Sequence, residues 1–417
     1  MLQNLKEKTV RFLRWSEQYT KTDMVYLAKG GGWLTFGQIL KTLAGLGLTI
    51  AFANLLPQET YGSYKYIISL AGIISIFTLT GLRTAVTQAV ARGYEGSLEY
   101  GFKQMLKWSS GIVIVALGCG AYYYLQGNIE FATAMFFIAV FYPVLKSTEL
   151  YQNFLEGVQD FKHRTLYISS WEIIQALVIV GTILLTDSLL MVLLAFFAAN
   201  AITPLFFFWL TKRKHKSNNK VDPDTLPYSK HLSIMNGIRN IAKHIDKVLV
   251  FQFLGPLQLA VYSFATLPVE KVRGLLGPIS TLALPKFSAA KKDDLLNTLP
   301  RKVGLFVIFS LSVVVVVIFA LPYLFELLFP AYMEAVAYAQ VYTLSFLFYP
   351  AILFEQALAG QADEKALYRI SAGESIFKIV SIGVLLWLYG IWGGILALVL
   401  TEAVKASLNS FYFYKMK

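Results

Sequence analysis

The chain has 417 residues, of which 56% are hydrophobic and only 15% charged, and its mean hydropathy is +0.56. A soluble protein carries roughly 25% charged residues and could not bury this much apolar surface, so we expect an all-α, polytopic membrane protein. The single cysteine, Cys119, excludes a disulfide framework and a cysteine metal cluster. The four histidines have no ligand spacing, so neither a metal nor a cofactor is expected.

The first 29 residues are charged rather than apolar, and no cleavable signal peptide is visible among them. We expect residues 1–29 to form a cytoplasmic amphipathic segment that turns Leu5, Phe12 and Trp15 toward the lipid headgroups. A disordered basic tail is the alternative. Beyond this segment, apolar runs near the ~20 residues that cross a bilayer recur to the end of the chain. They predict twelve transmembrane helices, near 32–53, 61–82, 106–125, 132–155, 166–185, 189–210, 232–253, 259–284, 303–322, 335–360, 367–389 and 394–414.

The basic residues are distributed unevenly between the two sets of connections. No Lys or Arg occurs in the odd-numbered connections, which are 54–60, 126–131, 186–188, 254–258, 323–334 and 390–393. Most of the 37 Lys and Arg residues lie in the even-numbered connections and the two ends, including the run TKRKHKSNNK at 211–220. The positive-inside rule then places both termini in the cytoplasm. The net charge of +12 therefore reflects topology, with anionic lipid as its partner rather than nucleic acid.

Several motifs occur twice in the chain, in the same order. ISSWEIIQALVIVG at 168–181 aligns without a gap with ISAGESIFKIVSIG at 370–383, and FYP occurs at 141–143 and at 348–350. We expect an N-lobe at 30–210 and a C-lobe at 231–417, joined by a cytoplasmic linker at 211–230. With six helices in each lobe, the two would be related by a pseudo-twofold axis along the membrane normal.

Charged residues fall inside several of the predicted helices, although each costs at least ~2.5–3.5 kcal/mol at the bilayer centre. Some have an opposite charge three or four residues away, as in Lys146–Glu149 and Lys243–Asp246, so mutual neutralisation is one interpretation. Predicted helices 1, 2, 7 and 8 nevertheless carry more cations than anions. We expect these cations to line a cavity that binds anions, phosphate above all; they are Lys41, Lys65, Arg239, Lys243, Lys247, Lys271 and Arg273.

Three acidic residues are candidates for coupling transport to an ion or a proton. Glu172 and Glu374 occupy equivalent positions in the repeated motif, and Asp246 lies among the cations of helix 7. Glu172 has no compensating cation on its own helix. It could therefore exchange a proton, or it could be bonded to a neighbouring helix.

Three stretches carry a resemblance to a known family. LPQETYGSYKYIISLAGI, GLRTAVTQAVAR and GIWGGILALVLTE, together with the two six-helix halves, resemble the Wzx-like oligosaccharide flippases of the multidrug/oligosaccharidyl-lipid/polysaccharide exporter (MOP) superfamily. The resemblance implies a V-shaped transporter that moves undecaprenyl-pyrophosphate-linked oligosaccharide to the outer leaflet by alternating access. It also implies that helices 1, 2, 7 and 8 line a cationic cavity.

The expected function is therefore flipping of a lipid-linked oligosaccharide for surface polysaccharide such as O-antigen, and not enzymatic catalysis. The expected protein is a monomer of the inner membrane, with polysaccharide-assembly proteins as further partners. A multidrug or cation antiporter of the same superfamily is the first alternative. An integral-membrane glycan polymerase or ligase is the second, but it would need an external catalytic loop, and the odd-numbered connections are short.

Overall fold

The computed structural model describes residues 24–215 and 217–416, and every regular element in these ranges is a helix. The all-α expectation is confirmed, whereas most of the predicted amphipathic segment lies outside the described residues. The elements are α2 (Met24–Leu55), α3 (Gln58–Ile74), η1 (Ser75–Phe77), α4 (Leu82–Ala91), α5 (Ser97–Trp108), α6 (Ser110–Leu125), α7 (Ile129–Thr148), α8 (Leu150–Gly157), α9 (Phe161–Leu185), α10 (Leu189–Lys214), α11 (Thr225–Ala289), α12 (Lys292–Leu328), η2 (Pro330–Tyr332), α13 (Ala335–Thr343), η3 (Leu344–Ala351), α14 (Ile352–Gly360) and α15 (Glu364–Lys415).

The two longest elements, α11 and α15, each consist of two antiparallel arms. In α11 the Tyr262 hydroxyl donates to Asp246 over 3.1 Å, although a straight helix would separate these residues by about 24 Å. The chain turns at Gly255, whose φ of 86° and ψ of −179° only glycine adopts readily. In α15 it turns at Gly390, with φ 58°, which brings Lys405 within 3.5 Å of Glu374.

The apolar helices identify a multi-pass membrane protein. Nine helices in the described part of the chain are long and apolar enough to cross a membrane, or ten if the bent pair of α3–η1 and α4 is one span. Two of the nine lie in α11 and α15. If the bent pair is one span and each of these two elements counts as two arms, the ten spans become the expected twelve. The count of twelve stays a prediction.

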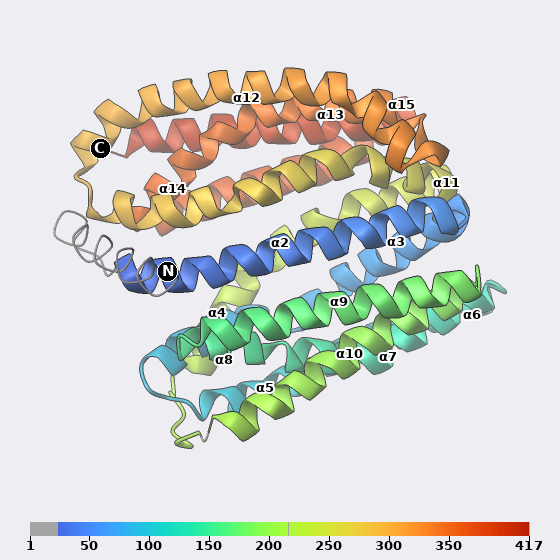
Figure 1. Ribbon diagram of the computed structural model, residues 1–417, viewed down its shortest axis with the longest axis horizontal. Coiled ribbons are helices and arrows are strands. Elements are labelled where there is room, and N and C mark those ends of the chain that lie inside the picture. Colours follow the sequence, from blue (N-terminus) through green and yellow to red (C-terminus); the bar gives the residue numbers. More distant parts are fainter. Residues whose placement is uncertain (1–23, 216, 417) are drawn as a thin grey trace, which may run out of the picture.

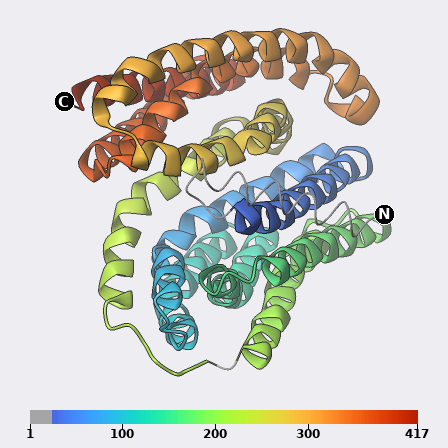
Figure 2. The ribbon, with the colours of Figure 1, turned by 60° about the vertical axis from the view of Figure 1, so that its left-hand side comes forward.

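The helices form two outer groups with a central layer between them. Figure 1 shows α5 to α10 on one side, α12 to α15 on the other, and α2, α3 and α11 in the middle. In the central layer α3 packs along α11, while α2 packs on α9 and α11 on α15. Figure 2 shows the extended segment between α10 and α11 at one end of the molecule. The helices leave only residues 215–224 of the expected linker outside them, because α10 continues to Lys214 and α11 begins at Thr225.

Two helices of the N-terminal half are interrupted, and the interruptions position polar and charged side chains near α11. The chain bends by 60° between the segments Gln58–Phe77 and Leu82–Ala91. There Thr78 and Ser75 donate their hydroxyls to backbone carbonyls, so the open turn has satisfied polar groups. The second break follows Pro143, where α7 gives way to α8 at Glu149. Together these breaks bring Arg83 and Lys146 toward α11.

Candidate functional site

A polar pocket of about 300 Å³ lies between the N-terminal half and the first arm of α11. We call it the interhalf pocket. The bent segment and α5 contribute Gly72, Ser75, Thr78, Thr80, Arg83 and Met105, α7 contributes Tyr142 and Lys146, and α11 contributes Asn236, Arg239, Asn240, Lys243 and His244. Asn240 ties the two sides together, because its amide donates to the Gly72 carbonyl over 2.9 Å and lies 3.1 Å from Ser75 Oγ.

The interhalf pocket has a strong excess of positive charge. The described residues of its lining include four cations, Arg83, Lys146, Arg239 and Lys243, and no carboxylate. Glu149, outside the lining, forms ion pairs with Arg83 and, over 3.7 Å, with Lys146. One carboxylate thus pairs with two cations. Within the described part of the chain, the hydrogen-bond partner of Arg239 is the Ser371 hydroxyl, at 2.8 Å. Such a pocket is suited to an anion with several oxygens.

A second pocket, of about 310 Å³, continues from the first inside the C-terminal half. We call it the C-half cavity. Arg239 and Lys243 line both pockets. In contrast to the interhalf pocket, the C-half cavity contains nearly as many acids as bases. Most of them are neutralised by ion pairs, two between α11 and α15 and one between the two arms of α11: Asp246–Lys378 at 3.6 Å, Arg273–Glu402, and Lys247–Glu270 at 3.9 Å.

The structure brings together four of the seven predicted cavity cations. Arg239, Lys243, Lys247 and Arg273 all line the C-half cavity. The other three lie outside the linings of both pockets. Lys41 is half exposed and pairs with Glu172, the Lys65 ammonium lies 5.3 Å from the Tyr61 ring, and the Lys271 ammonium lies close to Gly45.

The three candidate coupling residues all have partners from another helix or from the other arm of the same element. Glu172 is compensated by Lys41 of α2 at 2.9 Å, which matches the alternative of a bond to a neighbouring helix. Asp246 is buried between Tyr262 and Lys378. Glu374 pairs with Lys405 rather than with Lys378 of its own arm. Of the local pairs, Lys146–Glu149 is observed, but the Lys243–Asp246 pair is not among the ion pairs of the described residues.

Sequence reasoning missed two cations of the interhalf pocket. Arg83 looked like a loop residue at the cytoplasmic end of a helix, and Lys146 looked neutralised by Glu149. The signal for Arg83 was its position two residues after Gly81, in a bend that returns the chain toward α11. For Lys146 the signal was Pro143, three residues earlier, which precedes the end of α7.

The family becomes clear from comparison with known proteins. The model of a family described as polysaccharide biosynthesis protein matches residues 27–291, more than half of the chain. The chain belongs to the polysaccharide biosynthesis protein family. A search of curated proteins gives no match. The resemblance found in the sequence is therefore confirmed at the level of the family.

Solved structures share the fold of this polysaccharide biosynthesis protein at low identity. An inward-facing multidrug resistance MATE family transporter of the MOP superfamily is 13% identical, with a TM-score of 0.67 over 90% of this chain and 94% of that one. The lipid II flippase MurJ, in an inward closed conformation, is 13% identical. Its TM-score is 0.67 over 92% of this chain and 87% of that one. A MOP superfamily transporter from Pyrococcus furiosus, described as having a binding pocket of reverse polarity, is 14% identical. Its TM-score is 0.60 over 94% of this chain and 94% of that one. The chain thus has the fold of these MOP-superfamily and flippase structures, and its family is one described by polysaccharide biosynthesis.

Proposed function

We propose that the protein flips undecaprenyl-pyrophosphate-linked oligosaccharide from the inner to the outer leaflet by alternating access. The observation that carries the proposal is the interhalf pocket, whose lining, as far as the structure describes it, holds four cations and no carboxylate. A pyrophosphate offers two adjacent anionic groups, which Arg83, Arg239 and Lys243 can share. Arginine binds phosphate oxygens with two parallel hydrogen bonds, and lysine adds a compact charge.

The C-half cavity is suited to the sugar. It presents Ser375, Thr401 and Tyr342 beside paired charges, and polyhydroxylated rings exchange hydrogen bonds with such groups. Because most charges deeper in this cavity are paired, that part of it competes weakly for the pyrophosphate. The polyprenyl chain would stay in lipid between the two halves, where apolar side chains of α2 such as Phe36, Ile39 and Leu43 are exposed.

Export of cationic drugs is the second candidate, because the MATE neighbour is a multidrug resistance transporter and the C-half cavity contains carboxylates. Four of them line it: Asp246, Glu270, Glu374 and Glu402. Each has a Lys or Arg within 4 Å, however, so a cationic drug would first have to displace that partner.

The deciding experiment is native mass spectrometry of the full chain with three competing ligands: undecaprenyl-pyrophosphate glycan, undecaprenyl phosphate and a cationic drug. We expect the pyrophosphate lipid to be retained preferentially. Arg239→Ala should weaken its binding about 10- to 100-fold, since a hydrogen bond to a charged group contributes about 1.5–3 kcal/mol. The matched control is Arg301→Ala, which removes an exposed cation of α12 that lines neither pocket. Preference for the drug would instead assign the protein to the cation exporters.

The proposal includes an inner-membrane location with both termini in the cytoplasm. A membrane-impermeant maleimide applied to spheroplasts should label a cysteine at Asn128→Cys, in a connection without Lys or Arg. It should leave Asn218→Cys, in the basic connection, unlabelled until the membrane is opened. The reverse pattern would contradict the orientation.

A further inference from the structure

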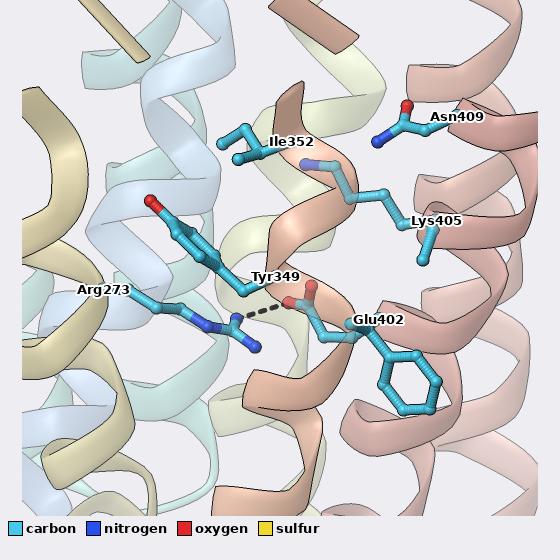
Figure 3. A pocket seen from close by; sticks show the side chains of 8 residues that line it. Arg273, Tyr349, Ile352, Glu402, Lys405 and Asn409 are labelled. Carbon is cyan, nitrogen blue, oxygen red and sulfur yellow. Dashed lines mark hydrogen bonds and ion pairs between the residues drawn. The ribbon is translucent and has the colours of Figure 1, made fainter. Parts of the chain in front are cut away.

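The pocket shown in Figure 3, of about 170 Å³, extends the C-half cavity. Arg273 and Glu402, which form an ion pair, line both spaces. Another pocket, of about 430 Å³, shares none of its described lining residues with these two or with the interhalf pocket. It lies where the extended segment after α10 enters α11, and we call it the linker pocket. Its lining consists of Ala85, Gln88 and Arg92 of α4 with Asp224, Thr225, Pro227 and Tyr228 at the start of α11.

The linker pocket lies on the outer side of α11, away from the interhalf pocket. Successive helix residues are rotated by about 100°, so Pro227, Ile234 and Ile238 share one face of α11. Asn236 and Lys243, which line the interhalf pocket, fall on the opposite face. Figure 2 shows this yellow-green first arm at the left edge of the molecule. Because Ile234 is 80% exposed and Ile238 is also exposed, an apolar strip leads away from the linker pocket.

Residues typical of a membrane surface occur at the level of the linker pocket. The Lys230 ammonium lies 5.3 Å from the ring centroid of the exposed Trp108. Lys and Trp side chains of membrane proteins gather at the lipid headgroups. Ile234 lies about 10 Å further along α11 than Pro227, on the side of the acyl chains. The linker pocket is therefore at headgroup depth, with the apolar strip beneath it.

A buried hydroxyl of the linker pocket lacks a partner. Thr225 is 2% exposed, and its Oγ1 forms no hydrogen bond with the residues that the structure describes. A buried polar atom without a partner costs free energy. The linker pocket is therefore suited to a ligand with a polar group at this hydroxyl.

The linker pocket also presents both signs of charge. Arg92 donates from Nη2 to Asp222 over 2.5 Å and from Nε to the Gln88 carbonyl over 3.3 Å, whereas its Nη1 forms no hydrogen bond in the described part of the chain. Asp224 does not cap α11 with its side chain and pairs with no cation among the described residues. A free donor thus lies in the same pocket as a free carboxylate. A ligand with only negative charge would be repelled by Asp224, and one with only positive charge would leave the Arg92 donor unused.

We propose that the linker pocket binds the headgroup of a phospholipid with a primary amine, such as phosphatidylethanolamine. Its phosphate would accept hydrogen bonds from Arg92 Nη1 and the Thr225 hydroxyl. Its ammonium would donate to the Asp224 carboxylate and lie over the Tyr228 ring, and an acyl chain would follow the apolar strip of α11. Because α4 belongs to the N-terminal half and α11 leads into the C-terminal half, the lipid would bridge the two. This site does not depend on which substrate the protein transports.

Photo-crosslinking in vesicles locates the lipid. The full-length protein is reconstituted in phosphatidylcholine that contains phosphatidylethanolamine with a diazirine in one acyl chain. The strongest labelling is expected within residues 225–238 of α11. The matched reference is the exposed face of α12 with Leu305, Ile308 and Val316, which contacts lipid but lines no part of the linker pocket. Labelling of α11 that is no stronger than that of α12 would overturn the proposal.

Native mass spectrometry of the full-length protein tests the chemistry of the headgroup. Phosphatidylethanolamine should be retained in preference to phosphatidylglycerol, which has the same phosphate but no amine. Asp224→Asn should weaken phosphatidylethanolamine binding about 10- to 100-fold and remove the preference, because asparagine neither attracts the ammonium nor repels the glycerol lipid. Thr225→Val should weaken both lipids alike, because it removes a donor to the phosphate that they share. Asp293→Asn, at an exposed carboxylate in the first turn of α12, is the matched control and should change neither.

Three outcomes of the mass spectrometry would overturn the proposal. The first is a preference for phosphatidylethanolamine that survives Asp224→Asn. The second is unchanged binding of both lipids by Thr225→Val. The third is displacement of the lipid by an equal concentration of glycerophosphoethanolamine, the headgroup without acyl chains, which would mean that the linker pocket takes a soluble ligand.

Discussion

At the scale of residues, the clearest pattern is that charges pair between helices. The Lys41–Glu172 pair joins α2 to α9 at 2.9 Å. A double-mutant cycle with Lys41→Met and Glu172→Gln should give a coupling energy of about 0.2–1 kcal/mol, the usual range for solvent-exposed ion pairs. Thermal unfolding in nanodiscs measures it. Additive effects of the two substitutions would show that the pair does not stabilise the fold.

Asp160 offers a pH-dependent prediction outside the membrane spans. Its carboxylate caps α9 through the His163 backbone N–H and accepts from the His163 ring, with Lys214 at 3.3 Å. Burial alone would raise the pKa of Asp160, but the hydrogen bonds from His163 and the charge of Lys214 together lower it to about 2. The folded state is therefore stabilised by the ionised form. That contribution is complete above the ordinary aspartate pKa and is lost as pH falls toward 2.

Asp160→Asn keeps the capping oxygen and removes the charge. At pH 7 it should lower stability by about 0.3–1 kcal/mol, the usual contribution of a charge at a helix N-terminus. The difference from the native protein should shrink as the pH is lowered below about 4. Melting temperatures at several pH values test this. A difference that does not depend on pH would mean that the charge is not what stabilises the cap.

At the scale of elements, the turn at Gly255 determines whether α11 can return as a second arm. Its φ of 86° with ψ near 180° is a conformation that L-residues adopt only with strain. Gly255→Ala should therefore destabilise the protein by about 1–3 kcal/mol, although a Cβ there would meet no atom within 4 Å. Gly47→Ala in helix α2 is the control, since its Cβ would also meet no atom within 4 Å and its φ lies outside the positive range. Equal melting temperatures for both variants would rule out backbone strain at the turn.

Most elements could be predicted from the sequence, but the partners of the charges could not. Hydropathy alone locates α9 and α10, because their apolar runs end at Thr186 and at the basic Lys212–Lys214. The pairing of Glu374 with Lys405 depends on how the two arms of α15 are rotated against each other. That rotation is determined by packing, and i,i+4 spacing cannot reveal it. For the same reason, four of the seven predicted cations line the C-half cavity and three do not.

At the scale of the whole molecule, the two halves are sealed at the end where α11 turns. Tyr61 of the N-terminal half packs on Phe264 at 5.1 Å, and Phe264 packs on Tyr332 at 3.9 Å between ring centroids. Asn54 donates across the same boundary to the Leu328 carbonyl over 2.9 Å. Arg239 of the interhalf pocket lies about 24 Å along the helix from Gly255. The anion site is therefore remote from the sealed end.

Under the proposed function, alternating access requires this seal to open in each transport cycle. A short, reducible cross-linker between Asn54→Cys and Leu328→Cys, in a Cys119→Ser background, should stop the flipping of lipid-linked oligosaccharide in proteoliposomes. Reduction should restore it. The control joins residues within one half, Asn128→Cys and Thr186→Cys, in connections without Lys or Arg. Because the Asn54–Leu328 cross-link holds the two halves together at this end, undiminished flipping would mean that substrate crosses without separation of the halves there.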